Sequence, residues 1–196
     1  MTAEPKTRAS ILDAAKQALL ESGYSGLSTR KIAVAAGVPL SQIHYHFGSK
    51  QGLVLEVLAE ENRKLIDRQK SMYSQDMPLW KQWEQACDFL DDDMESGYVR
   101  VLQEMVAAGW SNPEIAMAVK EMLREWFAVL SDVAERTAHR IGGLGPFTAA
   151  EGAVLAGAPF LGVEAMLLLG FSDDEVPSRS ALRKFGEVIR AMEEAR

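Results

Sequence analysis

Short polar and aromatic side chains are concentrated between residues 40 and 47, where a helix would present them on one face. A helix turns by about 100° per residue, so Ile43 and Phe47 point inward and His44 and His46 lie on opposite flanks. The outward side chains are Ser41, Gln42 and Tyr45. Groups of this size can reach phosphates and base edges of duplex DNA, whereas a merely solvated face more often carries Lys and Glu. The residue types therefore favour DNA contact over a solvated face.

Two short helices joined by a glycine turn would hold this face in place. Ile32, Ala33 and Ala36 fall at helical spacing, and Gly37 can adopt the left-handed conformation that ends a helix. Apolar residues then return four positions apart in the second helix. This layout is that of a helix-turn-helix, whose second helix enters the major groove.

Residues in and near this segment are suited to two different tasks. Arg30 can donate to O6 and N7 of guanine, and Gln42 can pair with adenine. Phosphate contacts are expected from Thr29, Tyr45, His46 and Lys50. Arg8, farther upstream, is explained equally well by phosphate contact or by simple exposure. The full set of predicted DNA-contacting residues is Arg8, Thr29, Arg30, Leu40, Ser41, Gln42, His44, Tyr45, His46 and Lys50.

Catalytic and metal-binding chemistry finds little support in the chain. The sequence has no glycine-rich phosphate loop, no nucleophile-elbow motif, no HExxH motif and no cysteine–histidine cluster of metal-binding spacing. His44 and His46 project about 200° apart on a helix, so they cannot readily share one metal ion. The acids at 91–93 are better explained as a solvated helix face. We therefore predict no enzyme activity, no catalytic residue, no metal and no cofactor.

Formal charge is distributed unevenly along the 196 residues. The chain carries −7 in total, but residues 1–50 hold six Lys or Arg against three Asp or Glu, giving +3 there and −10 in the remainder. A locally basic end suffices for phosphate contact. The acidic body limits indiscriminate binding or simply keeps the protein soluble.

Cysteine usage and apolar runs bear on the compartment. The single cysteine, Cys87, cannot form an internal disulfide, and we interpret it as a small apolar core residue. No run of eighteen apolar residues and no signal-peptide core are present. We expect a cytoplasmic protein that does not cross a membrane.

Helical periodicity continues through the whole chain, with no competing strand alternation. We predict an all-α fold of about nine helices: 6–22, 29–36, 40–47, 50–72, 78–96, 98–109, 112–140, 148–169 and 178–195. Segments 111–114 and 148–151 are predicted to be capping boxes. The expected organisation is a three-helix DNA-binding domain at 1–50 and a helical ligand-binding and dimerisation domain at 51–196.

The N-terminal third resembles the TetR family of bacterial helix-turn-helix transcription regulators. The residues that carry the resemblance are Leu27-Ser-Thr-Arg-Lys-Ile-Ala, Ala36-Gly-Val, Tyr45-His-Phe-Gly-Ser-Lys50 and Leu53, with Arg8, Ile11, Leu12, Ala14, Ala15 and Gly23 upstream. His44 and Pro39 depart from the usual pattern, which affects base preference rather than fold. The resemblance implies a homodimer that binds operator DNA and a small-molecule effector.

The last two predicted helices carry apolar residues at spacings of three and four, which suits close helix packing. Either an intramolecular core or a four-helix dimer interface would explain them, and we favour the interface. The predicted interface residues are Val154, Ala158, Leu161, Ala165, Leu168, Leu182, Phe185 and Ile189.

Tryptophan and methionine are concentrated after residue 70, and such side chains adapt to irregular ligands. An ordinary core would also explain them, but the family resemblance favours an effector cavity. The residues predicted to line it are Trp83, Cys87, Met105, Trp110, Met122, Trp126 and Phe127. We expect an apolar or aromatic ligand, with acids such as Glu104 and Glu125 able to tolerate a cationic group.

Two functions remain open at this point. A homodimeric, ligand-responsive repressor of a palindromic operator explains both halves of the chain. A helical small-molecule carrier without a DNA role would explain the aromatic body but leave Arg30, Gln42 and Tyr45 without a purpose.

Overall fold

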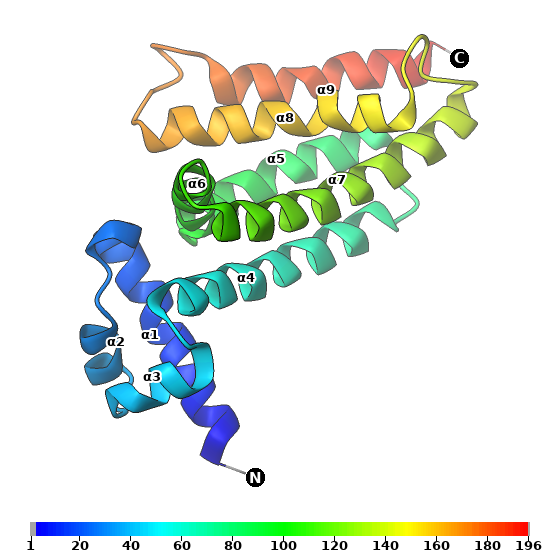
Figure 1. Cartoon of the computed structure of the whole chain (residues 1–196). Coiled ribbons are helices and arrows are strands. Elements are labelled where there is room, and N and C mark those ends of the chain that lie inside the picture. Colours follow the sequence, from blue (N-terminus) through cyan, green and yellow to red (C-terminus); the bar gives the residue numbers. More distant parts are fainter. Residues whose placement is uncertain (1–2, 196) are drawn as a thin grey trace. The chain divides into compact units, whose positions relative to one another are not determined.

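The computed structural model describes residues 3–195, and this part of the chain is all-α. The predicted fold class is confirmed, with nine helices in the described range and boundaries within a few residues of those predicted for most of them. Their bounds are α1 (Ala3–Gly26), α2 (Thr29–Ala35), α3 (Leu40–Phe47), α4 (Lys50–Tyr73), α5 (Leu79–Glu95), α6 (Tyr98–Gly109), α7 (Pro113–Ile141), α8 (Ala149–Leu168) and α9 (Ser178–Glu194) (Figure 1).

The chain divides into two compact units. The first unit comprises residues 1–63 and 97–120, and the second unit comprises 64–96 and 121–196. Helices α4 and α7 each contribute residues to both units. The predicted boundary at residue 50 falls inside the first unit, because α6 and the first turns of α4 and α7 join the three N-terminal helices there. The functional division at that boundary stays a prediction.

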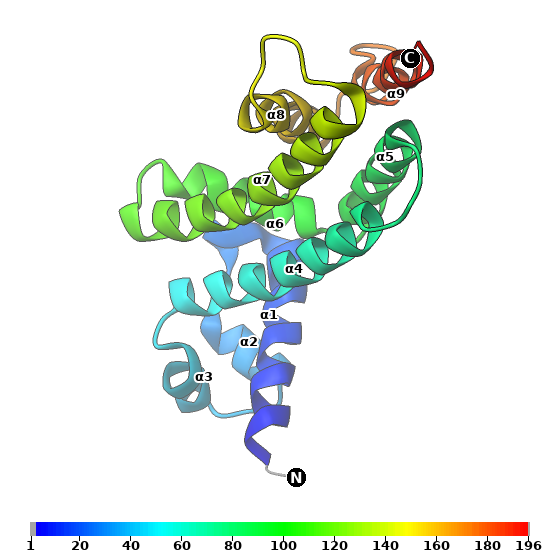
Figure 2. The same ribbon diagram turned by 90° about the vertical axis from the view of Figure 1, so that its right-hand side faces the viewer.

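The first unit is built around the inward stripe of α1, which packs with α2 and α3 (Figure 2). Ile11, Ala15 and Leu19 follow one another at intervals of four residues on α1, and all three are at most 1% exposed. Other buried side chains of this core come from α4 and α6: Leu53, Val54, Val57, Leu58, Val99, Leu102 and Met105. The three N-terminal helices, which we call the head, are therefore stabilised by residues that lie far beyond them in the sequence.

Helix α6 holds the C-terminal end of α1 through polar contacts. The helical path of α1 is interrupted at Gly23, whose φ of 67° favours glycine. The Glu104 carboxylate accepts the Tyr24 backbone N–H, and Arg100 Nη1 donates to Leu20 O at 2.9 Å. Glu104, which the sequence suggests as a partner for a cationic ligand, is therefore engaged in joining α6 to α1.

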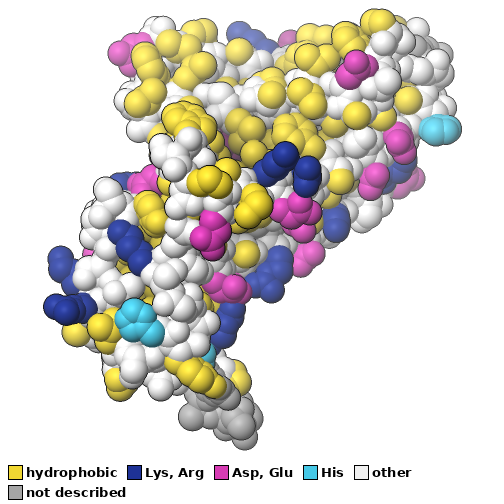
Figure 3. All heavy atoms as spheres, in the orientation of Figure 1, with side chains coloured by type: hydrophobic (Ala, Val, Ile, Leu, Met, Phe, Trp, Pro, Cys, Tyr) yellow, Lys and Arg dark blue, Asp and Glu magenta, His cyan; other side chains and the backbone are white. Residues whose placement is uncertain are grey.

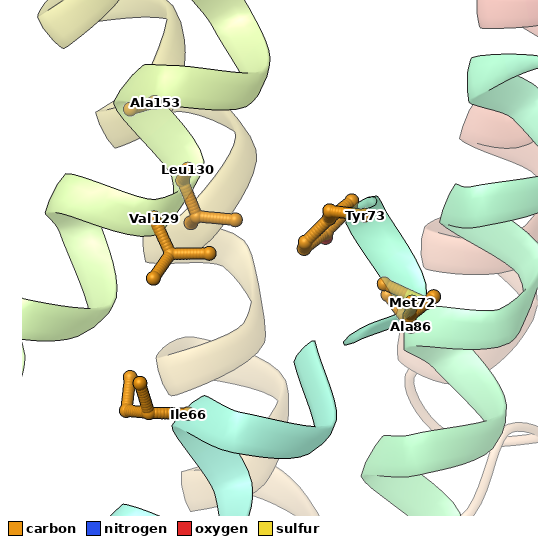
Figure 4. Packing of buried hydrophobic residues seen from close by; sticks show 7 residues of the cluster. All are labelled: Ile66, Met72, Tyr73, Ala86, Val129, Leu130 and Ala153. Carbon is orange, nitrogen blue, oxygen red and sulfur yellow. The ribbon is translucent and has the colours of Figure 1, made fainter. Parts of the chain in front are cut away.

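The second unit packs α5, α8 and α9 with the end of α4 and most of α7. Its buried cluster comprises Ile66, Met72, Tyr73, Ala86, Val129, Leu130 and Ala153 (Figure 4). The pair α5 and α9 is fixed by Trp83, whose Nε1–H donates to Leu182 O at 2.7 Å. Leu182 is 6% exposed and packs within the chain, so little of its surface is left for the predicted dimer interface.

The predicted helix caps are confirmed in one case and shifted in the other. Thr148 and Glu151 form a capping box at the start of α8, and these hydrogen bonds lower the pKa of the Glu151 carboxyl. Helix α7 begins at Pro113, so Asn112 takes the capping position instead of Ser111. Asn112 Oδ1 accepts from Glu114 N at 3.0 Å and Ile115 N at 3.2 Å, and thereby satisfies two free amides of the first turn.

Helix α8 bears on the expectation that the protein does not cross a membrane. It is long and apolar enough to do so by length and composition alone. Ala153, Gly157, Val163 and Glu164 are buried within the second unit, as expected for a packed helix, while apolar residues such as Leu155 and Val154 stay exposed. Its composition is therefore explained by one face in the core and a second apolar face that is exposed.

Backbone crowding at Gly52 fixes how α3 meets α4, and it generates a prediction. A Cβ at this position would lie 2.2 Å from Phe47 O, so Gly52→Ala should lower the free energy of unfolding by about 1–3 kcal/mol despite the helix preference of Ala. Gly162→Ala is the control, since its methyl group meets nothing within 4 Å. Urea unfolding followed by circular dichroism would measure both, and equal stability of the two variants would contradict the crowding argument.

Candidate nucleic-acid interface

Helices α2 and α3 are joined by the predicted glycine turn. Gly37 has a φ of 67°, and the turn is closed by Val38 N donating to Ala33 O at 2.9 Å and Gly37 N donating to Val34 O at 3.1 Å. A side chain other than glycine would be strained in this conformation. The sequence therefore sets the angle at which α3 leaves α2.

The inward face of the helix-turn-helix is fully packed. Ile32 and Ile43 are 0% exposed and Ala33 is 3% exposed, which anchors α2 and α3 to α1. On the opposite side of α3, Ser41 and Tyr45 are exposed, as predicted. With the inner face fixed by packing, this outer face is a rigid surface available to a ligand as large as a duplex.

The remaining predicted residues of α3 are less uniform in exposure. His44 is exposed, whereas Leu40, Gln42 and His46 are half-buried. His44 Nδ1 lies 3.3 Å from Gly48 O at the end of the helix. His46 Nε2 is sealed from solvent and has no hydrogen-bond partner among the described residues, while its ring packs edge-on against Tyr45. A phosphate contact through that nitrogen would require the ring to turn, because packing now covers it.

Two predicted phosphate contacts, Arg8 and Lys50, are occupied by internal interactions. Arg8 forms an ion pair with Glu56 and lies over the Phe47 ring at 5.7 Å. Lys50 Nζ lies 3.4 Å from Ser25 O and 4.8 Å from the centre of the Tyr24 ring. Both cations therefore help to hold α1, α3 and α4 together, and any DNA contact by them would be added to that structural role.

Exposed cations of α2 provide the clearest positive surface of the head. Arg30 and Lys31 are both exposed, Thr29 is half-buried at the first position of α2, and Figure 3 shows Lys and Arg side chains gathered beside this helix. Lys31 and Val34 were not among the predicted contacts, and Val34 is 82% exposed. The helical spacing that places Ile32 inward also places Lys31 and Val34 outward, so the exposure of both could have been predicted from the sequence. Together they offer a phosphate contact and an apolar contact beside α3.

Helix α4 begins with a serine cap. Gly52 N donates to Ser49 Oγ at 3.0 Å, which satisfies one of the free amides in the first turn. Asn112 Nδ2 donates to Gln51 Oε1 at 2.8 Å, so the link between α6 and α7 also holds this turn. The start of α4 is thus fixed from two sides.

The residues predicted to line an effector cavity are divided between the two units. Met105 and Trp110 lie in the first unit, where Met105 is fully buried and Trp110 is 82% exposed. This exposure does not suit the wall of an enclosed cavity. The others lie in the second unit and are buried or half-buried: Trp83, Cys87, Met122, Trp126 and Phe127.

Cys87 and the acidic residues give no indication of reactive or metal chemistry. Burial raises the pKa of the Cys87 thiol to about 11, so it is neutral at physiological pH. Within residues 3–195, no group of three or more His, Cys, Asp or Glu side chains is placed to hold a metal ion.

Comparison of the sequence with known families identifies the N-terminal segment. Residues 11–57 match the model described as "Bacterial regulatory proteins, tetR family". The chain is 24% identical over 123 residues to the HTH-type transcriptional regulator UidR of Escherichia coli, covering 58% of this chain and 57% of UidR. It is 31% identical over 61 residues to the HTH-type transcriptional repressor AcnR of Corynebacterium glutamicum, covering 31% and 32% of the two chains. The chain thus spans less than two thirds of the curated relatives that it matches.

Solved structures resemble the whole fold at low sequence identity. A putative TetR-family regulator from Mesorhizobium loti matches with a TM-score of 0.77 and 19% identity, covering 100% of this chain and 98% of that one. A putative transcriptional regulator from Saccharomonospora viridis in complex with choline matches with a TM-score of 0.76 and 24% identity, covering 93% of this chain and 96% of that one. FadR from Bacillus subtilis in complex with stearoyl-CoA matches with a TM-score of 0.75 and 16% identity, covering 94% of this chain and 96% of that one. These similarities establish the arrangement of helices.

The two cations of α2 should contribute differently to DNA binding. Arg30→Ala should weaken binding to a preferred duplex by about 1–3 kcal/mol and relax the preference at one base pair, because a bidentate contact to guanine is lost. Lys31→Ala is the matched control and should weaken all sequences alike, with a salt slope smaller by about 1. Fluorescence anisotropy on preferred and scrambled duplexes at several salt concentrations would separate them. Equal losses on both duplexes for Arg30→Ala would rule out base recognition by this residue.

Proposed function

Because the chain belongs to the TetR family of bacterial regulatory proteins, we propose that it is a ligand-responsive transcription repressor that binds a palindromic operator as a homodimer. The observation that carries the proposal is the outward face of α3, held rigidly by the fully buried Ile43 and flanked by the exposed cations of α2. This surface lies within the segment that matches the family model.

Dimeric operator binding follows from the geometry of the major groove. Two recognition helices must enter successive grooves about 34–36 Å apart, so the operator is palindromic and its affinity depends on their separation. Helix α4 begins against the end of α3 at Gly52 and continues to Tyr73 in the second unit. We propose that the effector changes the separation of the recognition helices through α4, which requires unequal affinity for the two states.

The proposed homodimer is supported by exposed apolar side chains on α8 and α9. Figure 3 shows hydrophobic side chains gathered over these two helices. Exposed large residues on them include Val154, Leu155, Phe185, Val188 and Met192. Ala158 and Leu168 of the predicted interface are also exposed, while Leu161, Ala165 and Ile189 are half-buried. Two apolar helices with this exposure are suited to a four-helix contact between two copies.

We propose that the effector is a small apolar or aromatic molecule bound in the second unit. Solved structures of similar fold hold choline and stearoyl-CoA, which differ greatly in charge and size. The fold therefore accommodates ligands of different chemistry, and the effector of this chain depends on the residues that line its own binding site. A repressor acts at the chromosome, so we expect the protein in the cytoplasm.

Selection from random duplexes tests the proposed function directly. The purified protein should enrich a palindromic sequence, because each copy presents the same α3 face to one half-site. The variant Tyr45→Ala should lose enrichment while keeping its helical circular dichroism, since Tyr45 is 72% exposed and contributes little to the core. Enrichment of no sequence, or of an unpaired half-site alone, would contradict a dimeric repressor. Tight ligand binding with no DNA binding would instead favour a carrier.

The dimer surface can be tested with charges placed on residues that are exposed in a single chain. Leu155 and Val188 are 57% and 50% exposed, so Leu155→Glu with Val188→Glu should leave the fold intact but bury unpaired charges in a dimer. Sedimentation equilibrium should give the monomer mass, and operator affinity should fall. The control is Trp110→Glu with Met117→Glu, at sites that are 82% and 67% exposed outside α8 and α9. Dimer mass in the first variant would place the interface elsewhere.

A further inference from the structure

Two polar side chains lie inside the apolar part of the second unit, one helical turn apart on α4. Gln69 and Tyr73 are each 8% exposed and, at i and i+4, face the same side of the helix. Buried polar groups normally find hydrogen-bond partners, because leaving one unpaired costs free energy. The Gln69 amide nitrogen and the Tyr73 hydroxyl are not among the sealed unpaired atoms of the described residues, so both donors reach space that is open to a ligand or to water.

The amide orientation of Gln69 is determined by its one partner. Trp126 Nε1–H donates to Gln69 Oε1 at 2.9 Å. An indole nitrogen can only donate, so the oxygen of the amide must face Trp126 and its NH2 group must face the other way. Among the described residues this NH2 group has no acceptor, which leaves Gln69 as a donor.

Tyr73 presents a second donor. Its side-chain hydroxyl makes no hydrogen bond to any described residue, and Figure 4 shows the ring projecting from the end of α4 toward the side where Val129 and Leu130 lie. Burial and the nearby Cys87 thiol raise the pKa of the Tyr73 phenol, so the hydroxyl keeps its proton at any cellular pH. The Cys87 thiol also keeps its proton and is a weak acceptor.

The surroundings of these donors are apolar and incompletely covered. Large hydrophobic side chains pack against the buried cluster but stay only partly buried themselves: Leu65, Phe89, Trp126, Phe127, Val133 and Phe160. Their remaining exposure leaves apolar side-chain surface available to a bound molecule. Gly157 allows α8 to approach closely here, since a Cβ at that position would lie 2.8 Å from both Leu130 and Phe127.

We propose that this interior binds a small apolar molecule carrying a neutral hydrogen-bond acceptor, such as a ketone, ester or lactone carbonyl, between the Tyr73 hydroxyl and the Gln69 NH2 group. Two donors call for an acceptor, and an apolar environment disfavours an ion. Glu164 is buried on α8, but it already has a partner within the chain. The proposal rests on the proposed function in taking the second unit as the effector-binding part.

A matched pair of probes isolates the acceptor. 2-Acetylnaphthalene and 2-isopropenylnaphthalene have nearly the same shape, but the carbonyl oxygen of the first is a methylene group in the second. Isothermal titration of the full-length protein should give an affinity about tenfold higher for the ketone. The ratio should fall in Tyr73→Phe, which removes one donor, and in Gln69→Leu, which removes the other.

Thermal stability separates ligand contact from a structural role. Tyr73→Phe should keep the wild-type Tm, because its hydroxyl has no partner to lose within the described chain. Tyr98→Phe is the control: the Tyr98 hydroxyl donates to Asn62 Oδ1 at 3.4 Å in the first unit. That variant should lower the Tm and leave the affinity ratio unchanged.

Several outcomes would overturn the proposal. These are equal affinity for ketone and alkene in the wild type, no binding of the ketone, a ratio that survives in Tyr73→Phe, or tighter binding of 2-naphthyltrimethylammonium than of the ketone. Operator selection is scored separately on the same preparation. If the protein binds no DNA but keeps the ketone preference, the proposed repressor is refuted and the binding site stands. If it binds DNA but shows no ketone preference, only the binding site is refuted.

Discussion

The close contact between Gly52 and the Phe47 carbonyl is the constraint on which the recognition surface depends. It allows α4 to start directly against the last residue of α3, and the Arg8–Glu56 ion pair with the Phe47 ring holds α1 at the same place. The outer face of α3 can therefore be rigid without any contribution from its own polar residues. Because α4 continues without a break to Gln69 and Tyr73, one helix carries both this contact and the proposed ligand donors.

Much of the fold could be predicted from local patterns. The stripe of Ile11, Ala15 and Leu19, the left-handed glycine at 37 and the capping box at Thr148 each depend on residues within a few positions of one another. The cap of α7 was misplaced by one residue because Ser111 and Asn112 are both good capping residues, and only the position of Pro113 in the first turn decides between them.

The site was less predictable wherever a partner comes from a distant segment. Arg8 and Lys50 have the charge of phosphate contacts, but Glu56, Tyr24 and Ser25 engage them in the folded chain. Leu182 has the spacing of an interface residue, but α5 covers it in the same chain. Gln69 and Tyr73 were overlooked for the same reason, since a polar residue on a helix gives no local sign that tertiary packing will bury it.

The joint between α6 and the end of α1 has a consequence for protein engineering. Tyr24 and Leu20 depend on Glu104 and Arg100, and the missing side chain of Gly97 leaves room for Leu20. A chimera that joins residues 1–50 to the ligand-binding part of another regulator would therefore divide the first unit and expose the surface of α1 that packs against α6. The part that can be transferred is the first unit with both of its segments. DNA-binding helices can be exchanged between regulators only together with the α6 residues that pack against them.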